Sequence, residues 1–196
     1  DRLYGGNQND RLYGGNQKDY LDGGNQKDAL YGGNHNDTLK GGKHNDKLYG
    51  GKHNDKLYGG KHHDKLYGDA GNDRLYGDKG KDVLVGGKGR DFLYGGRDND
   101  RDIFVFEHIK DSKKGGQRDK IWNFKSKKDD IDLRKIDANA KKGGNQKFKF
   151  NDDDPSANSV WFKRGMLYGD VNGNGKADFQ IQLVGVKSIQ SGDILL

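Results

Sequence analysis

The sequence predicts an all-β chain in which a parallel solenoid of nonapeptide repeats is followed by a β-rich cap. A nine-residue unit of the form GG-x-x-x-D-x-L-x recurs eleven times between Gly5 and Ile103, and a fixed short period is typical of a solenoid. The chain has 33 glycines and one proline among 196 residues, which favours many tight turns. Its 30% of hydrophobic residues suits the thin core of stacked coils.

Each unit divides into a turn and a short strand. The glycine-rich first six residues predict the turn, and the last three predict a strand whose alternation points the leucine inward and its two neighbours outward. Two units then make one coil, so residues eighteen apart are expected to stack at about the 4.8 Å spacing of strands. The result is two parallel sheets whose leucines meet in the core.

One aspartate stands at the sixth place of every unit. Stacked carboxylates repel one another at neutral pH unless a cation lies between them. Ca²⁺ accepts about six to eight oxygen ligands in loose geometry, and glycine-rich turns supply backbone carbonyls. The alternative is a metal-free solenoid whose aspartates accept hydrogen bonds from neighbouring turn amides. The candidate ligands are Asp10, Asp19, Asp28, Asp37, Asp46, Asp55, Asp64, Asp73, Asp82, Asp91 and Asp100.

Three units, GDAGND, GDKGKD and GGKGRD, closely resemble the repeats-in-toxin family, whose unit GGxGxDxUx forms a calcium-bound parallel β-roll. The resemblance implies calcium as the cofactor. It implies ligands at Asp73, Asp82 and Asp91, assisted by carbonyls of the turns that begin at Gly68, Gly77 and Gly86.

Seven earlier units lack the glycine that this family carries at the fourth place. Such a glycine usually serves a positive φ, which strains other residues, so these turns are expected to bind calcium weakly or to take another geometry. Stacked histidines also raise a zinc or nickel alternative, but we favour a solvent-facing ladder because no cysteine or convergent carboxylate accompanies them. The seven residues that replace glycine at the fourth place are Gln8, Gln17, Gln26, His35, His44, His53 and His62.

The last unit is ambiguous in a different way. It contains Asp98, Asp100 and Asp102 within five residues, and any of the three is a candidate to terminate the roll.

The outward residues beside the leucines are mostly cations and tyrosines. Bound calcium would neutralise the aspartates, so the formal net charge of +6 understates the positive charge of the loaded chain, which favours polyanions. An acidic polysaccharide such as alginate is one candidate, with tyrosines stacking on sugar rings; a solvated face is the alternative, and nucleic acid is disfavoured because no recognised binding motif is present. The candidate residues are Lys47, Lys56, Lys65, Arg74, Tyr49, Tyr58, Tyr67 and Tyr76.

The predicted domains are the repeats at 1–103 and the cap at 104–196, where alternating apolar residues indicate short strands. The last third, beginning SVWFKRGMLYGD, resembles the C-terminal domain that caps the β-roll of serralysin-type secreted metalloproteases. This resemblance implies a secreted, extracellular module that follows a catalytic domain. The segment DVNGNGKAD imitates a calcium loop, but Ile181 occupies the place of the EF-hand glutamate, so a hairpin turn is expected.

The terminal SGDILL resembles the signal that bacterial type I exporters read, although an ordinary edge strand would look similar. Calcium is scarce in the cytosol and abundant outside, so it would couple folding to export.

No catalytic residue is expected. The HExxH motif of serralysin-type proteases and a Ser/His/Asp arrangement are both absent, and the paired acids Asp129 and Asp130 are expected in a solvated loop. No segment approaches the roughly 20 apolar residues of a membrane span, there is no cysteine, and the start in mid-repeat indicates a fragment. The sequence therefore predicts a non-catalytic calcium-binding C-terminal module of a larger secreted enzyme.

Overall fold

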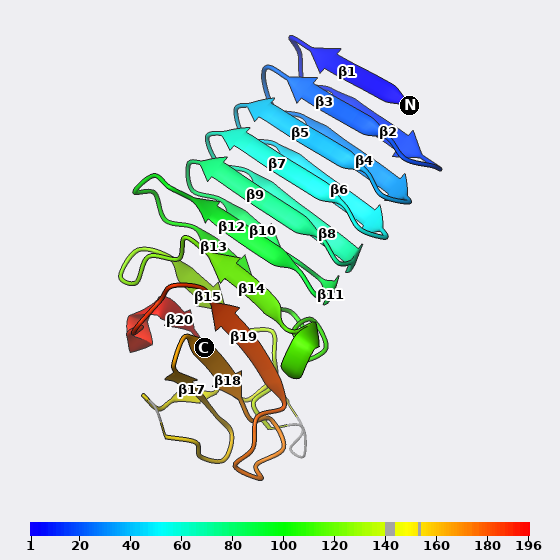
Figure 1. Cartoon of the computed structure of the whole chain (residues 1–196). Coiled ribbons are helices and arrows are strands. Elements are labelled where there is room, and N and C mark those ends of the chain that lie inside the picture. Colours follow the sequence, from blue (N-terminus) through cyan, green and yellow to red (C-terminus); the bar gives the residue numbers. More distant parts are fainter. Residues whose placement is uncertain (140–143, 153) are drawn as a thin grey trace.

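The computed structural model describes residues 1–139, 144–152 and 154–196. Figure 1 shows two layers of parallel strands stacked along one axis, with the repeats at one end and the yellow-to-red cap at the other. Within the described residues the only helices are short 3₁₀ turns, η1 (Gly115–Gln117) and η2 (Ser191–Asp193). The predicted all-β solenoid is confirmed.

The strands form two sheets, and odd and even units of the repeat alternate between them. Sheet A has the order β1 (Arg2–Gly6), β3 (Tyr20–Gly24), β5 (Thr38–Lys43), β7 (Lys56–Lys61), β9 (Arg74–Lys79), β12 (Phe92–Gly96), β14 (Asp119–Trp122), β19 (Phe179–Leu183), β18 (Met166–Gly169), β17 (Ser159–Lys163) and β16 (Lys149–Phe150). Sheet B has the order β2 (Arg11–Gly15), β4 (Ala29–Asn34), β6 (Lys47–Lys52), β8 (Lys65–Gly71), β10 (Val83–Val85), β13 (Ile103–Val105), β15 (Asp130–Asp132) and β20 (Ile194–Leu195), and β11 (Lys88–Gly89) also pairs with β8.

The register confirms the predicted stacking at eighteen residues. Leu39 pairs with Leu57 in sheet A, and Leu48 pairs with Leu66 in sheet B. The leucines from Leu21 to Leu93 have no exposed surface and form one strip between the sheets. Because a thin strip buries few side chains per residue, each coil depends on its two neighbours for its share of the core.

Glycine at the second place of the repeat allows adjacent coils to approach closely. Gly60 has a φ of +111°, and a Cβ added to it would lie 2.3 Å from the carbonyl oxygen of Gly42. A side chain does not fit at that distance, so the second place is glycine in most coils, and Asp69 and Asp78 are the exceptions on sheets B and A.

The sheets run without a break from the repeats into the cap. β14 pairs in parallel with β12, and β15 pairs in parallel with β13, so the boundary predicted at residue 103 falls inside β13. β19 and β20 add one more parallel strand to each sheet, and β17 and β18 close sheet A as antiparallel strands. The cap thus covers the last edge of the roll.

We predict that Leu57→Ala in the middle of the roll lowers the free energy of unfolding by about 2–5 kcal/mol, because it leaves a cavity in a core that no other residue can fill. Leu3→Ala is the matched control, since Leu3 lies on the end coil and is only partly buried. Urea unfolding in saturating calcium measures both variants. Equal losses would contradict the stacked core.

Candidate metal centre

A ladder of aspartates follows each row of turns and is held by backbone hydrogen bonds between coils. The N–H of Asp46 donates to Oδ1 of Asp64 at 2.7 Å, and the N–H of Asp64 donates to Oδ1 of Asp82 at 2.7 Å. The same bond recurs at eighteen-residue spacing from Asp10 onward. One oxygen of each carboxylate therefore makes the turn-amide contact of the metal-free alternative.

The second oxygen of these carboxylates has no hydrogen-bond partner. Asp73, Asp82 and Asp91 have no exposed surface, and their Oδ2 atoms are buried with neither donor nor ion pair. A buried polar atom without a partner costs free energy, so each such atom needs an explanation. The unpartnered Oδ2 atoms belong to Asp10, Asp19, Asp28, Asp37, Asp46, Asp55, Asp64, Asp73, Asp82, Asp91 and Asp119.

Burial makes these carboxyl groups weak acids. Desolvation raises the pKa of Asp46 to about 8 and those of Asp73 and Asp82 to about 9, although the backbone N–H that each Oδ1 accepts opposes the rise. Neighbouring carboxylates along the ladder raise the same pKa values further. The metal-free ladder thus favours bound protons, and a bound cation would take their place.

The first-place glycine gives the free oxygen room beside a backbone carbonyl. A Cβ on Gly77 would lie 2.5 Å from Oδ2 of Asp82 and 2.6 Å from the carbonyl oxygen of Gly95, and Gly68 has the same surroundings. A Cβ on Gly86 would lie 2.5 Å from Oδ2 of Asp91. Each glycine therefore faces oxygen atoms of the type that Ca²⁺ prefers.

The donor set suits a hard cation better than a transition metal. Among the described residues there is no cluster of three or more His, Asp or Glu side chains that would hold an ion by itself. Any ion must take backbone carbonyls as well as carboxylates, which is usual for calcium and unusual for zinc. The residues present fit calcium, because their donor atoms are carboxylate and backbone carbonyl oxygens.

The turns fall into the two classes that the fourth place predicted. His44 and His62 have φ values of 77° and 79°, whereas Gly71 and Gly80 have φ values of 158° and 120°. A Cβ on Gly80 would lie 1.9 Å from the carbonyl oxygen of His62, so only glycine fits the second class. The left-handed conformation costs a non-glycine residue about 1–3 kcal/mol, as expected for strained early turns.

Histidine side chains support the strained early turns. The N–H of His35 donates to Nδ1 of His53 at 3.1 Å, and the N–H of His44 donates to Nδ1 of His62 at 3.2 Å. The rings of each pair stack with centroids 5.2 Å apart, and all four are exposed. Because Nδ1 accepts a hydrogen bond, the neutral ring carries its proton on Nε2 and no free nitrogen faces a metal. The solvent-facing ladder is the better interpretation.

The ladder does not include Asp100, which the nine-residue period had placed in it. The last turn is two residues longer, so the N–H of Asp82 donates to Oδ1 of Asp102, while Asp100 is exposed. Asp119 and Asp129 continue the two rows by accepting the N–H groups of Asp91 and Asp102. The repeat could not indicate these two, because they lie in the cap, outside the period.

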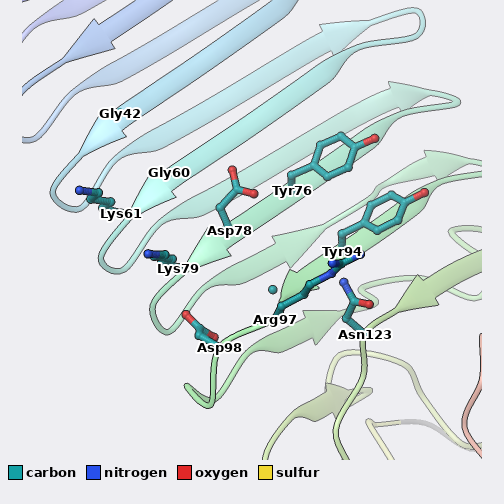
Figure 2. Close-up of a pocket in the computed structure, with 11 residues that line it drawn as sticks. Gly42, Gly60, Lys61, Tyr76, Asp78, Lys79, Tyr94, Arg97, Asp98 and Asn123 are labelled. Carbon is teal, nitrogen blue, oxygen red and sulfur yellow. The ribbon is translucent and has the colours of Figure 1, made fainter.

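The predicted polysaccharide residues do not share one face. Lys56, Tyr58, Arg74 and Tyr76 lie on sheet A, and the other four, Lys47, Tyr49, Lys65 and Tyr67, lie on sheet B. The tyrosines also stack on one another, with centroids 4.8 Å apart for both Tyr58–Tyr76 and Tyr49–Tyr67. Figure 2 shows Tyr76 and the next ring, Tyr94, side by side on sheet A. Their faces are occupied, which argues against stacking on sugars.

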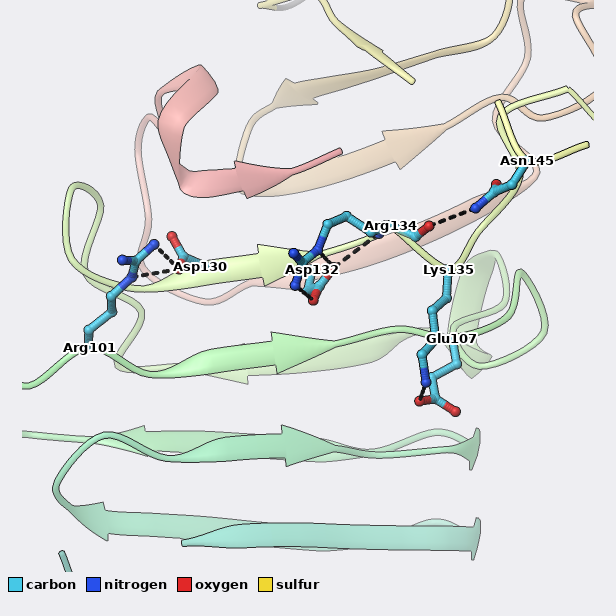
Figure 3. A network of polar contacts seen from close by, with 7 residues as sticks. All are labelled: Arg101, Glu107, Asp130, Asp132, Arg134, Lys135 and Asn145. Atoms are coloured by element: carbon cyan, nitrogen blue, oxygen red, sulfur yellow. Dashed lines mark hydrogen bonds and ion pairs between the residues drawn. The ribbon is translucent and has the colours of Figure 1, made fainter. Parts of the chain in front are cut away.

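Asp129, Asp130 and Asp132 of the cap are structural rather than solvated. Figure 3 shows Arg101 paired with Asp130 and Arg134 paired with Asp132. Nη2 of Arg134 lies 2.7 Å from Oδ2 of Asp132. Asp129 is 2% exposed and accepts the N–H groups of Asp102 and Lys125, so the prediction of a solvated loop for Asp129 and Asp130 is wrong.

The segment DVNGNGKAD forms a hairpin connection, as predicted. It joins the antiparallel strands β18 and β19, and Asp170 accepts the N–H groups of Asn172, Gly173 and Gly175. Asp178 accepts the N–H groups of Val171 and Asn172. Both carboxylates thus bind their own loop.

A family model described as peptidase M10 serralysin C terminal matches residues 14–196, which is nearly the whole chain. The chain belongs to the serralysin C-terminal family. This membership confirms the resemblance found in the repeats and the cap. Serralysin C-terminal domains are non-catalytic parts of secreted proteases and are of the repeats-in-toxin type.

The fold of this serralysin C-terminal domain is similar to that of a solved epimerase repeat. The solution structure of the AlgE6R3 subunit from the Azotobacter vinelandii mannuronan C5-epimerase matches with a TM-score of 0.53 and 25% sequence identity. The alignment covers 74% of this chain and 78% of that chain. No curated protein matches the chain. Over the described ranges, no helix has the length and apolar character of a membrane span.

We predict that the chelated chain becomes less stable as the pH rises. The folded pKa values of Asp37 to Asp82 are about 6 to about 9, above the value of about 4 in an unfolded chain. The folded state therefore binds more protons, and this stability is fully present below about pH 4 and is lost as the pH rises to about 9. The folded fraction in a chelator, followed by circular dichroism, should therefore fall over that range.

The same titration in saturating calcium is the control. Calcium binding releases these protons, so its stabilisation should grow with pH. A chelated chain that gained stability between about pH 5 and about pH 8 would contradict the buried, protonated ladder.

Proposed function

We propose that this domain is a calcium-binding, non-catalytic C-terminal module of a larger secreted enzyme, and that Ca²⁺ folds it outside the cell. The observation that carries the proposal is the row of buried carboxylate oxygens without partners along both turn rows. Calcium would supply the missing partner and the charge compensation. Binding to the folded chain alone then stabilises it by mass action.

The three units with glycine at the fourth place are the strongest calcium sites in this proposal. Their ligands are Asp73, Asp82 and Asp91, whose side chains are fully buried. Asp10 to Asp64 would bind more weakly. The fourth-place residues from Gln17 to His62 take the left-handed conformation, and their stacking is already supported by Gln and His contacts. Asp102 extends one row in place of Asp100.

The position of the C-terminal segment supports a link between calcium and export. Asp193 is 2% exposed and accepts hydrogen bonds from Ser126 Oγ and from the N–H of Lys127. Ile194 pairs with Ile131 as part of sheet B. A type I exporter would therefore read SGDILL only in the unfolded chain, which low cytosolic calcium preserves.

The larger enzyme would supply the activity from a catalytic domain that precedes this module. Two acids of the cap that a reaction could use are engaged in structural contacts: Asp130 pairs with Arg101, and Asp170 accepts three loop N–H groups. This module would then serve export and stability, in the extracellular space where calcium is abundant.

Asp82→Asn tests the ligand role. Asparagine keeps an acceptor for the N–H of Asp64 but replaces Oδ2 by an amide, so we expect the calcium midpoint of folding to rise by about tenfold or more. The folded fraction in chelator at about pH 8 should not fall, since the folded variant no longer has to bind the proton that Asp82, with a pKa of about 9, takes up. Circular dichroism during a calcium titration reports both quantities.

Asp100→Asn is the matched control for the same change of charge, and it should leave the midpoint within about twofold because Asp100 is exposed. Equal midpoints for the two variants would refute the assignment.

A further inference from the structure

The loop between β18 and β19 contains two asparagine–glycine pairs, Asn172–Gly173 and Asn174–Gly175. No other asparagine of the chain is followed by glycine. An asparagine in such a pair is prone to deamidation, because glycine has no Cβ to hinder the approach of its backbone nitrogen to the preceding side chain. This loop of the cap therefore carries two groups that can change covalently without an enzyme.

The reaction needs only the two residues and water. The backbone nitrogen of the glycine attacks the side-chain carbonyl carbon of the asparagine, and its proton leaves with the amide nitrogen as ammonia. The product is a five-membered succinimide ring. Water then opens either of the two C–N bonds of the ring, which leaves an aspartate or an isoaspartate. The step that decides the rate is the attack, so the position and protonation of the glycine nitrogen control it.

One buried carboxylate holds both attacking nitrogens in the folded loop. The N–H of Gly173 donates to Oδ1 of Asp170 at 2.9 Å, and the N–H of Gly175 donates to Oδ2 at 2.7 Å. Asp170 has no exposed surface, so water does not compete for these bonds. The negative charge beside each N–H also opposes loss of its proton. Both nitrogens thus point at an acceptor instead of at a side-chain carbonyl carbon.

The two asparagine side chains are restrained to different degrees. Asn172 is half-buried, its Nδ2 donates to Oδ1 of Asp178 at 2.6 Å, and its Oδ1 accepts the N–H of Asn174 at 3.1 Å. Asn174 is exposed, and its Oδ1 accepts the N–H of Lys176 at 2.8 Å. Both ends of the Asn172 amide are therefore held, and Asn174 is the less restrained of the two.

We propose that this loop is a self-modification site controlled by folding: Asn174, followed by Asn172, deamidates when the loop opens, and Asp170 prevents the reaction while the loop is closed. The inference rests on the proposed function only where it names loss of calcium as the event that opens the loop. The calcium ladder itself takes no part in the chemistry.

Deamidation would oppose closure of the same loop. An isoaspartate lengthens the backbone path, so the N–H of Gly175 no longer reaches Asp170 in the same register. At Asn172 the new carboxylate would replace the donor that now contacts Oδ1 of Asp178, and two carboxylates at that distance repel each other. A chain that stays without calcium for long would therefore lose the ability to refold this part of its cap.

The test measures deamidation at both asparagines by peptide mass mapping of the full chain, incubated at mildly alkaline pH in saturating calcium, in a chelator and in urea. At each asparagine the calcium-folded chain should react at least about tenfold more slowly than the urea-unfolded chain, because the reaction then requires local opening. In calcium, Asn174 should react before Asn172. Chain aged in a chelator should need more calcium to regain its β-structure, as followed by circular dichroism.

The variant Asp170→Asn separates the two sites in the calcium-folded chain. Its Oδ1 still accepts the N–H of Gly173, but the amide nitrogen in place of Oδ2 cannot accept the N–H of Gly175. Deamidation at Asn174 should therefore become about threefold faster or more, with a smaller change at Asn172. Asp100→Asn makes the same change of charge at an exposed position of the roll and should leave both rates unchanged.

Equal rates in the calcium-folded and urea-unfolded chains would overturn the inference, and so would a folded Asp170→Asn chain that deamidates like the unmodified one. If Asp170→Asn does not fold, the comparison of folded with urea-unfolded chain decides alone. A chain that folds on calcium without protecting its asparagines refutes this inference only. A chain whose circular dichroism ignores calcium refutes the proposed function and leaves the comparison with urea valid.

Discussion

Each coil of this domain is joined to the next by an aspartate whose carboxylate has a hydrogen-bond partner on only one of its two oxygens. Its Oδ1 atom accepts the N–H of the aspartate one coil earlier, as between Asp64 and Asp82 at 2.7 Å, and this bond sets the register of the stack. Its Oδ2 atom is buried with no partner. The bond that joins the coils therefore brings a desolvated oxygen with it, and the roll is stable only where a proton or a cation compensates that oxygen.

The remaining features of the repeat follow from the close stacking that this ladder requires. Gly77 leaves room for Oδ2 of Asp82, and Gly60 lets the carbonyl of Gly42 approach. Where the fourth place is not glycine, His53 and His62 bond to the preceding turns and offset their backbone strain. The N-terminal turns are thus supported by side chains, and the C-terminal turns depend more strongly on their carboxylates.

Much of this fold was predictable from the period, because eighteen residues per coil fixes the strand pairing and places the leucines in the core. The period indicated less where it is broken, and by itself it did not show that alternate units lie on opposite sheets. Two extra residues before Ile103 move the ladder from Asp100 to Asp102. Asp119 and Asp129 join it from cap segments with no repeat. Alternate units lie on opposite sheets, so Lys47 and Lys56 cannot belong to one surface.

The dependence of the whole stack on its carboxylates is tested most directly by far-ultraviolet circular dichroism of the unmodified chain at about pH 7.5, titrated with calcium from a chelated start. The account predicts little strand signal in chelator and a cooperative gain of β-structure on adding calcium, with magnesium ineffective because it demands a tighter octahedral site. A chain that is fully folded in chelator, and that calcium leaves unchanged, would contradict it.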